Sequence, residues 1–195
     1  MKEDTTLMLN QNQYEEQFSL TDGSSCRLKQ IESNEEIQAF IDLQTEVWGK
    51  EGTGELPYSL IKVIAQYGGI VGGAFLENGH LLGMVMSLPI LMGRGLSQWS
   101  YRLAVDKNYR DQQLGYKLKQ YQKEACKKMG FDQIYWSYDP LESKNAYLNL
   151  IKLGCEVISY ERDFYKDSKS VIHSGLHTDR LIVRLPLSDS TVTGI

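Results

Sequence analysis

The sequence has only three cysteines, Cys26, Cys126 and Cys155, and they lie far apart in the chain. An odd and widely spaced set excludes a disulfide framework and predicts reduced thiols, as in the cytosol. The first residues contain neither a basic stretch nor an apolar stretch, so no secretory signal is expected. The longest apolar run, residues 81–92, is shorter than the roughly 20 residues that cross a bilayer. These absences predict a cytoplasmic protein with no membrane partner.

Basic residues are outnumbered by acidic ones. The chain has 21 Lys and Arg residues and 25 Asp and Glu residues, which gives a formal net charge of −4. Phosphate binding needs a basic face, so nucleic acid is not an expected partner. The 195 residues, 42% hydrophobic and 24% charged, are typical of one soluble globular domain. We expect this domain over residues 23–187, with a polar tail or loosely docked strand in residues 1–22 and a tail in residues 188–195.

Hydrophobic periodicity predicts alternating strands and helices. Ser33 followed by Glu36 is a capping-box pattern that begins a helix. Asn78-Gly79 between two apolar runs predicts a hairpin, because a type I′ turn requires positive φ at both positions. The order predicts an α/β domain with a mixed, mainly antiparallel sheet flanked by helices. Expected strands are residues 26–31, 70–75, 80–86, 99–105, 134–138, 156–160 and 181–185, and expected helices lie near residues 34–48, 57–64, 114–129 and 142–153.

The most informative segment is residues 103–118, where a strand ends, a polar turn carries Arg110, and a helix begins near Gly115. Helix N-termini present unpaired N–H groups and the positive end of the helix dipole, which suits a phosphate or pyrophosphate. Residues 101–130 contain eight basic and three acidic residues, so this segment is positive within an acidic protein. Lys123, Lys127 and Lys128 are expected on a solvated helix face, whereas Arg110 and its turn are expected to contact a ligand.

This segment resembles motif A of the GNAT acyltransferase superfamily, Gln/Arg-x-x-Gly-x-Gly/Ala, which wraps the pyrophosphate of an acyl-coenzyme A. Arg110 matches the first position and Gly115 the last, while Gln113 stands at the middle glycine. Residues 136–154, with Asp-Pro-Leu, Asn145-Ala146 and a final Leu-Gly, are similar to the next strand and helix of the superfamily. Together with Thr178-Asp179-Arg180, they resemble a subgroup of predicted acetyltransferases. The order of elements from about residue 26 to residue 185 fits as well.

The resemblance implies a GNAT-like domain whose sheet splays in the middle. It implies acetyl-CoA or another acyl-CoA as co-substrate, direct transfer to a small-molecule amine, and no metal. The cofactor contacts that it implies are the backbone of Leu103, Ala104 and Val105, the turn and helix start at Arg110, Asp111, Gln112, Gln113, Leu114, Gly115, Tyr116 and Lys117, and the side chain of Asn145.

Residues for proton transfer carry a weaker signal. Many members have a tyrosine four residues before the last glycine that protonates the departing thiolate, and here that position is Leu150. A thiol of pKa near 8.5 leaves tolerably as an anion, so the loss is survivable. Tyr147 and Tyr138 are candidate replacements, and Asp139 is a candidate base whose alternative role is to form a turn. Arg180 would bind a substrate carboxylate or form an internal ion pair.

One rival function stays open, and a metal site is not expected. Gln113 and Leu150 motivate a non-catalytic coenzyme A-binding or regulatory module as the rival function. His173 and His177 are four residues apart, but no third ligand accompanies them, and Gly175 between them indicates a loop, so no metal site is expected.

Overall fold

The computed structural model describes residues 14–49, 56–93, 95–165 and 178–187, which form one eight-stranded sheet with helices on both faces. The strand order is β1-β2-β3-β4-β5-β6-β8-β7. The expected α/β fold with a mixed sheet is confirmed. The strands are β1 (Glu16–Ser19), β2 (Ser25–Gln30), β3 (Ile70–Leu76), β4 (Leu81–Met92), β5 (Gly95–Val105), β6 (Gln133–Tyr138), β7 (Glu156–Glu161) and β8 (Arg180–Pro186), and the helices are α1 (Asn34–Trp48), α2 (Tyr58–Gln66), α3 (Leu114–Lys128) and α4 (Ser143–Ala146).

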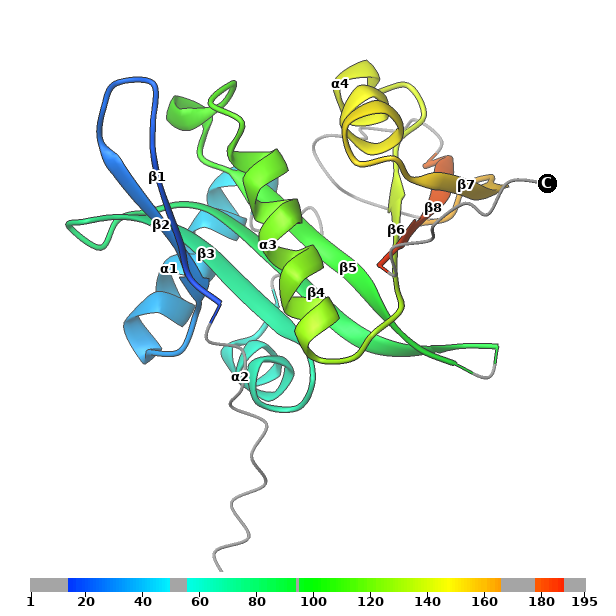
Figure 1. Cartoon of the computed structure of the whole chain (residues 1–195), viewed down its shortest axis with the longest axis horizontal. Coiled ribbons are helices and arrows are strands. Elements are labelled where there is room, and N and C mark those ends of the chain that lie inside the picture. Colours follow the sequence, from blue (N-terminus) through cyan, green and yellow to red (C-terminus); the bar gives the residue numbers. More distant parts are fainter. Residues whose placement is uncertain (1–13, 50–55, 94, 166–177, 188–195) are drawn as a thin grey trace, which may run out of the picture.

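The helices cover the two faces of the sheet unequally. Figure 1 shows α3 crossing one face, while α1 and α2 lie behind the sheet. The core is divided accordingly into one cluster beneath α3, which includes Leu118 and Tyr121, and a second beneath α1 and α2, which includes Phe40 and Ile61. In the part of the chain that the structure describes, no helix is both long enough and apolar enough to cross a membrane.

The helix α1 begins and ends where the sequence predicts. The hydroxyl of Ser33 accepts a hydrogen bond from the backbone N–H of Glu36 (3.2 Å), and the Glu36 carboxylate accepts from the backbone N–H of Ser33 (3.2 Å). This capping box satisfies two N–H groups that the first turn leaves unpaired. The helix ends at Gly49, whose φ of +78° favours glycine.

The β4–β5 hairpin is longer than the predicted strands. β4 continues through Pro89 to Met92, although proline removes a ladder donor. The reason lies in the register: β3 begins at Ile70 opposite Ser87, so the later residues of β4 have β5 on one side only. Proline is tolerated at such an edge.

Residues 142–153 do not form the single α-helix that the sequence predicts. After the short α4, residues Tyr147–Lys152 form π-helical turns, in which the backbone N–H of Leu153 bonds to the carbonyl of Leu148 (3.0 Å). The wider turn buries Asn149, whose side-chain oxygen accepts the indole N–H of Trp136 on β6 (3.3 Å). Hydrophobic spacing does not distinguish a π-turn from an α-turn over so few residues, and π-turns are frequent at functional sites.

Candidate functional site

The sheet separates between β5 and β6. These strands are parallel and pair only at Gln98 with Ile134 and at Trp99 with Tyr135. The strands diverge beyond these pairs, and we call this divergence the β5–β6 fork (Figure 1). A register shift leaves Tyr101 as an extra residue on β5 at the same point, and such a bulge bends its strand. The edge of β5 that faces the fork therefore presents backbone N–H and C=O groups that need another partner.

The turn after β5 leads into a helix start that is open to an anion. Arg110 is exposed, and two residues of the turn, Asp111 (φ 63°) and Gln113 (φ 62°), have left-handed backbones. Gln113 makes no side-chain cap to α3, and the first turn of α3 contains no acidic residue. A Cβ built on Gly115 would meet no atom within 4 Å. At these positions no capping or acidic side chain competes with an anion for the N–H groups and the dipole of α3.

Gln113 keeps the backbone that a glycine would adopt. Its φ of 62° and ψ of 9° lie in the left-handed region, which costs a non-glycine residue about 1–2 kcal/mol. Its side chain is exposed, so it does not fill the helix start. The neighbouring Gln112 points away toward the turn between β1 and β2, where its side-chain oxygen accepts from the Thr21 hydroxyl (3.1 Å). The departure from the glycine motif therefore changes the side chain but preserves the shape of the turn.

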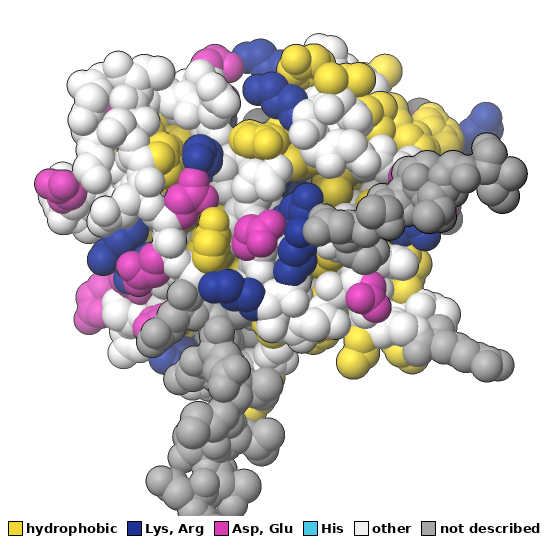
Figure 2. Space-filling view, viewed as in Figure 1, with side chains coloured by type: hydrophobic (Ala, Val, Ile, Leu, Met, Phe, Trp, Pro, Cys, Tyr) yellow, Lys and Arg dark blue, Asp and Glu magenta, His cyan; other side chains and the backbone are white. Residues whose placement is uncertain are grey.

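The positive charge of this segment is partly neutralised. Lys117 pairs with Glu16 on β1 (2.6 Å), which draws its ammonium toward β1, and its role in pyrophosphate binding stays a prediction. Lys144 pairs with Asp111 (3.0 Å). Figure 2 shows the same mixture on this face of the molecule, where Lys and Arg side chains lie beside Asp and Glu. The region is a mosaic of both signs rather than a continuous basic patch.

The start of α4 lies across the mouth of the fork from the start of α3. The Lys144–Asp111 ion pair joins the two segments, and both of its side chains are exposed. The next residue, Asn145, is the predicted pantetheine contact, and it is exposed. Tyr147 is 56% exposed, and the ammonium of Lys152 lies 5.8 Å from its ring centroid. The structure thus brings the two predicted cofactor segments together at one mouth.

Asp139 and Arg180 form an internal pair at the end of β6. Arg180 is only 7% exposed, and its Nη1 lies 3.7 Å from Oδ2 of Asp139. The guanidinium also donates to the backbone carbonyl of Asp179 (2.9 Å) and lies 5.3 Å from the ring centroid of Tyr165. Asp139 accepts in addition the backbone N–H of Leu141 (2.9 Å), which is a turn-forming contact. The structure therefore supports an internal ion pair for Arg180 and a turn-forming role for Asp139. The catalytic role of Asp139 and the substrate-binding role of Arg180 stay predictions.

Tyr138 lies next to this pair. It is buried, and no residue in the described ranges contacts its hydroxyl by a hydrogen bond. Burial raises the pKa of this phenol. A proton donor with a raised pKa keeps its proton at neutral pH, so its role as general acid stays a prediction. The two histidines discussed above, His173 and His177, lie outside the described residues.

Sequence reasoning missed one residue at the fork, Lys119. It is one of the eight basic residues of residues 101–130, yet its side chain is 3% exposed. Its ammonium donates to the hydroxyl of Ser100 (2.7 Å) and to the side-chain oxygen of Gln122 (3.1 Å). It also lies 3.7 Å from the ring centroid of Trp136. Burial lowers the pKa of Lys119 to about 7. The available signal was that Lys119, Gln122 and Cys126 share one stripe of α3 at helical spacing.

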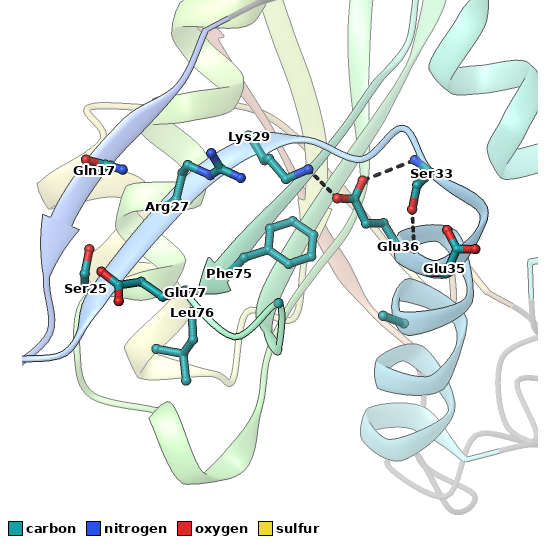
Figure 3. Close-up of a pocket in the computed structure, with 12 residues that line it drawn as sticks. Gln17, Ser25, Arg27, Lys29, Ser33, Glu35, Glu36, Phe75, Leu76 and Glu77 are labelled. Carbon is teal, nitrogen blue, oxygen red and sulfur yellow. Dashed lines mark hydrogen bonds and ion pairs between the residues drawn. The ribbon is translucent and has the colours of Figure 1, made fainter.

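A cavity of about 490 Å³ lies elsewhere, between β2, the start of α1 and the β3–β4 turn (Figure 3). Its lining includes Arg27 and Lys29 from β2 and Glu36 from α1, and Figure 3 shows Lys29 pointing toward Glu36, with which it forms an ion pair. Glu36 is itself part of the capping box of α1. None of the predicted site residues lines this cavity, and β2 is separated from β5 by two strands. The fork is therefore the candidate site.

Comparisons with known proteins agree with this geometry. The sequence profile of the acetyltransferase (GNAT) family matches residues 31–154. The ribosomal-protein-S18-alanine N-acetyltransferase of Escherichia coli has a TM-score of 0.62 at 14% identity, over 87% of this chain and 99% of that chain. A chain of the NatC complex bound to Gag peptide and CoA has a TM-score of 0.66 at 13% identity, over 84% and 99%. Aminoglycoside 6'-acetyltransferase type Ii has a TM-score of 0.63 at 18% identity, over 83% and 97%. No curated protein sequence matches the chain with significance.

Proposed function

Because the chain belongs to the acetyltransferase (GNAT) family, we propose that it is an N-acyltransferase that takes its acyl group from an acyl-coenzyme A. Acetyl is the acyl group that we expect first, and a small-molecule amine is the expected acceptor. One observation carries the proposal: the β5–β6 fork opens beside a helix N-terminus at which the N-cap residue Gln113 makes no side-chain cap and the first turn contains no acidic residue.

Each part of the cofactor has a matching part of the fork. The pyrophosphate would accept hydrogen bonds from the backbone at the start of α3, with Arg110 as the nearest exposed cation of the turn. The pantetheine arm would pair with the edge of β5 at residues 103–105, which β6 leaves unpaired. Asn145 would bind the arm from the other side of the mouth. A free N–H on this edge would also polarise the thioester carbonyl, as an oxyanion donor does.

Direct transfer in a ternary complex fits the fork, because its described residues include no activated nucleophile and the thiols of Cys126 and Cys155 are buried with a raised pKa. Holding the amine against the thioester carbonyl supplies much of the rate through orientation. The amine must first lose a proton, which at pH 7 costs about 1.4 kcal/mol for an amine of pKa near 8 and over three times as much for a lysine-like amine. The candidate base that the sequence predicts at the fork, Asp139, is occupied by Arg180 and by the backbone of Leu141, so the described residues favour α-amines and other weakly basic amines.

We propose that Asp139, Tyr138 and Arg180, at the end of β6 and the start of β8, lie where the amine binds. With the more exposed Tyr147, they would be the residues nearest the reaction. Arg180 would reach a substrate carboxylate only by sharing or releasing its contact with Asp139. The similar structures support no single class of acceptor. One of them is named as an N-acetyltransferase of a ribosomal-protein alanine, and another as an aminoglycoside acetyltransferase. The acceptor is therefore best found by experiment.

The test is release of free thiol from acetyl-CoA and from succinyl-CoA in the presence of amines. The panel should contain amino acids, a peptide with an N-terminal alanine, a peptide with an internal lysine and an aminoglycoside. We expect thiol release that depends on both the protein and the amine. Coenzyme A that raises the melting temperature while no amine gives turnover would instead support the rival function, a non-catalytic binding module. Absence of any shift at millimolar coenzyme A would contradict both.

A further inference from the structure

Lys119 lies at the apex of the β5–β6 fork. The last paired residues are Trp99 and Tyr135, so Ser100 and Trp136 are the first residues on each strand beyond the pairing. The ammonium of Lys119 contacts both of them, at 2.7 Å from the Ser100 hydroxyl and 3.7 Å from the Trp136 ring centroid. One cation from α3 therefore spans the point at which the sheet opens.

The surroundings of this ammonium leave its charge without an anion. The titratable groups that face it are the thiols of Cys126 on α3 and Cys155 ahead of β7, and burial raises the pKa of both, so they are neutral near pH 7. The other contacts, from Ser100, Gln122 and the Trp136 ring, are neutral as well. Among the described residues, no carboxylate lies within ion-pair distance of Lys119. Two hydrogen bonds and the Trp136 ring stabilise the ammonium in part, but no anion among the described residues balances its charge. A buried cation in this state is costly, so a packing role alone does not account for it.

The apex also contains more polar atoms than the described residues satisfy. The side-chain nitrogen of Gln122 and the hydroxyl of Ser87, which lies opposite Ser100 across the β4–β5 ladder, have no hydrogen-bond partner among them. Buried polar groups in native proteins are nearly always partnered. A polar group of a ligand that reached the apex would find donors there.

We propose that Lys119 is a catalytic residue that contacts the sulfur of the acyl-CoA thioester and stabilises the coenzyme A thiolate as it departs. The inference rests on the proposed function, because that function places the pantetheine arm along β5. From Val105 back to Ser100 the strand covers about 17 Å at its usual rise, so an extended arm bound at residues 103–105 continues toward the apex.

The chemistry balances as follows. The neutral amine forms a C–N bond to the thioester carbonyl carbon, and the C–S bond then breaks with its electron pair on sulfur. The nitrogen loses one proton to solvent as the amide forms. The Lys119 ammonium pairs with the thiolate, gives it a proton when coenzyme A leaves as the thiol, and takes a proton back from water. In many members of the family a tyrosine hydroxyl protonates the departing thiolate, and this chain has Leu150 at the matching position. Lys119 would take over that role.

The experiment titrates the thiol of bound coenzyme A by thiolate absorbance, with the complex of desulfo-coenzyme A as the spectral blank. For the wild-type protein we expect the thiolate to form at least one pH unit below the titration of free coenzyme A, that is, at least tenfold more thiolate at a given neutral pH. In Lys119→Met the bound thiol should titrate like the free thiol. Lys119→Arg keeps a charge and should keep the effect, and Lys123→Met, which removes a charge elsewhere on α3, should titrate like wild type.

The outcomes separate the two proposals. If neither coenzyme A nor its desulfo analogue binds, the proposed function fails first. If both bind but the wild-type complex titrates like free coenzyme A, the proposed function stands and the role of Lys119 is overturned; this result needs no variant, so a misfolded Lys119→Met does not block it. Desulfo-coenzyme A should bind wild type and Lys119→Met within about twofold, whereas a tenfold loss in that variant would make Lys119 a structural residue and overturn the inference as well.

Discussion

Gly115→Asp should strengthen the fold and weaken the binding of coenzyme A. Gly115 is in the first turn of α3, and a Cβ at this position meets no atom within 4 Å. Replacing a helical glycine by aspartate gains about 0.3 kcal/mol of stability from helix propensity. A carboxylate in the first turn adds about 0.3–1 kcal/mol by its interaction with the helix dipole. Without ligand, the variant should therefore unfold at a temperature equal to or above that of the wild type.

The same carboxylate should repel the pyrophosphate. Two unit charges about 4 Å apart interact with about 4 kcal/mol at the effective dielectric typical of a protein surface, and salt reduces this. Taking one half of that value as the net effect, about 2 kcal/mol, predicts a loss of affinity of roughly 30-fold. The signs of the two effects are opposite, so a general loss of folding would not imitate them.

Calorimetric titration with coenzyme A measures the affinity, and thermal unfolding without ligand measures the stability. Gly115→Asn is the matched control, because it has the size of aspartate without its charge. It should lose only the part of the affinity that is due to bulk, and added salt should recover part of the loss in Gly115→Asp but not in Gly115→Asn. Equal affinities for wild type and Gly115→Asp would show that the pyrophosphate binds elsewhere and would refute the reasoning.

Three further predictions concern stability. Gln113→Gly relieves a left-handed backbone and should stabilise the free protein by up to about 1 kcal/mol in denaturant unfolding, whereas a decrease would mean that the Gln113 side chain stabilises the turn. Arg180→Lys disturbs the pair with Asp139 and should destabilise the protein by about 1–3 kcal/mol with a weaker affinity for both ligands; a raised KM for the amine alone, at unchanged melting temperature, would instead support the substrate role. Burial lowers the pKa of Lys119 from 10.5 to about 7, so above pH 7 the unfolded chain binds more protons than the folded chain and stability rises with pH. Between pH 7 and about pH 8.5, where unfolded cysteines begin to titrate, the rise in Lys119→Met should be smaller by up to about 1.4 kcal/mol per pH unit, and equal slopes would contradict the lowered pKa.

The elements that local rules specify could be predicted from the sequence. The capping box at Ser33, the hairpin between β3 and β4 and the amphipathic α3 each depend on residues within one turn or one hairpin of each other. The type of the hairpin turn was predicted wrongly, because a type I′ turn needs positive φ at both Asn78 and Gly79 and only Gly79 has it (φ 85°). The extension of β4 past Pro89 could not be predicted, because it depends on where β3 begins across the sheet. The π-turns after α4 likewise depend on a bond between Trp136 and Asn149, which belong to different elements.

The candidate site divides in the same way. The turn from Arg110 to Gly115 is contiguous in sequence, so its motif can be recognised without knowledge of the fold. The pair of Asp139 with Arg180 joins residues 41 positions apart, and sequence alone left the role of Arg180 undecided. The burial of Lys119 depends on Ser100 and Trp136 on two other elements, so a count of charges could not separate it from the solvated lysines of the same helix.

The two departures from the family pattern, Gln113 and Leu150, have different physical consequences. At Gln113 the requirement is a backbone shape, and a neighbouring turn can impose that shape on any residue at a cost of about 1–2 kcal/mol, as the φ of 62° records. At Leu150 the requirement is a functional group, which no backbone adjustment can supply. A lost group can be replaced only from another element that reaches the same point, and α3 places the ammonium of Lys119 at the apex of the fork. The first departure therefore predicts a change in stability with little change in binding, and the second predicts that the chemistry moves to a different side chain.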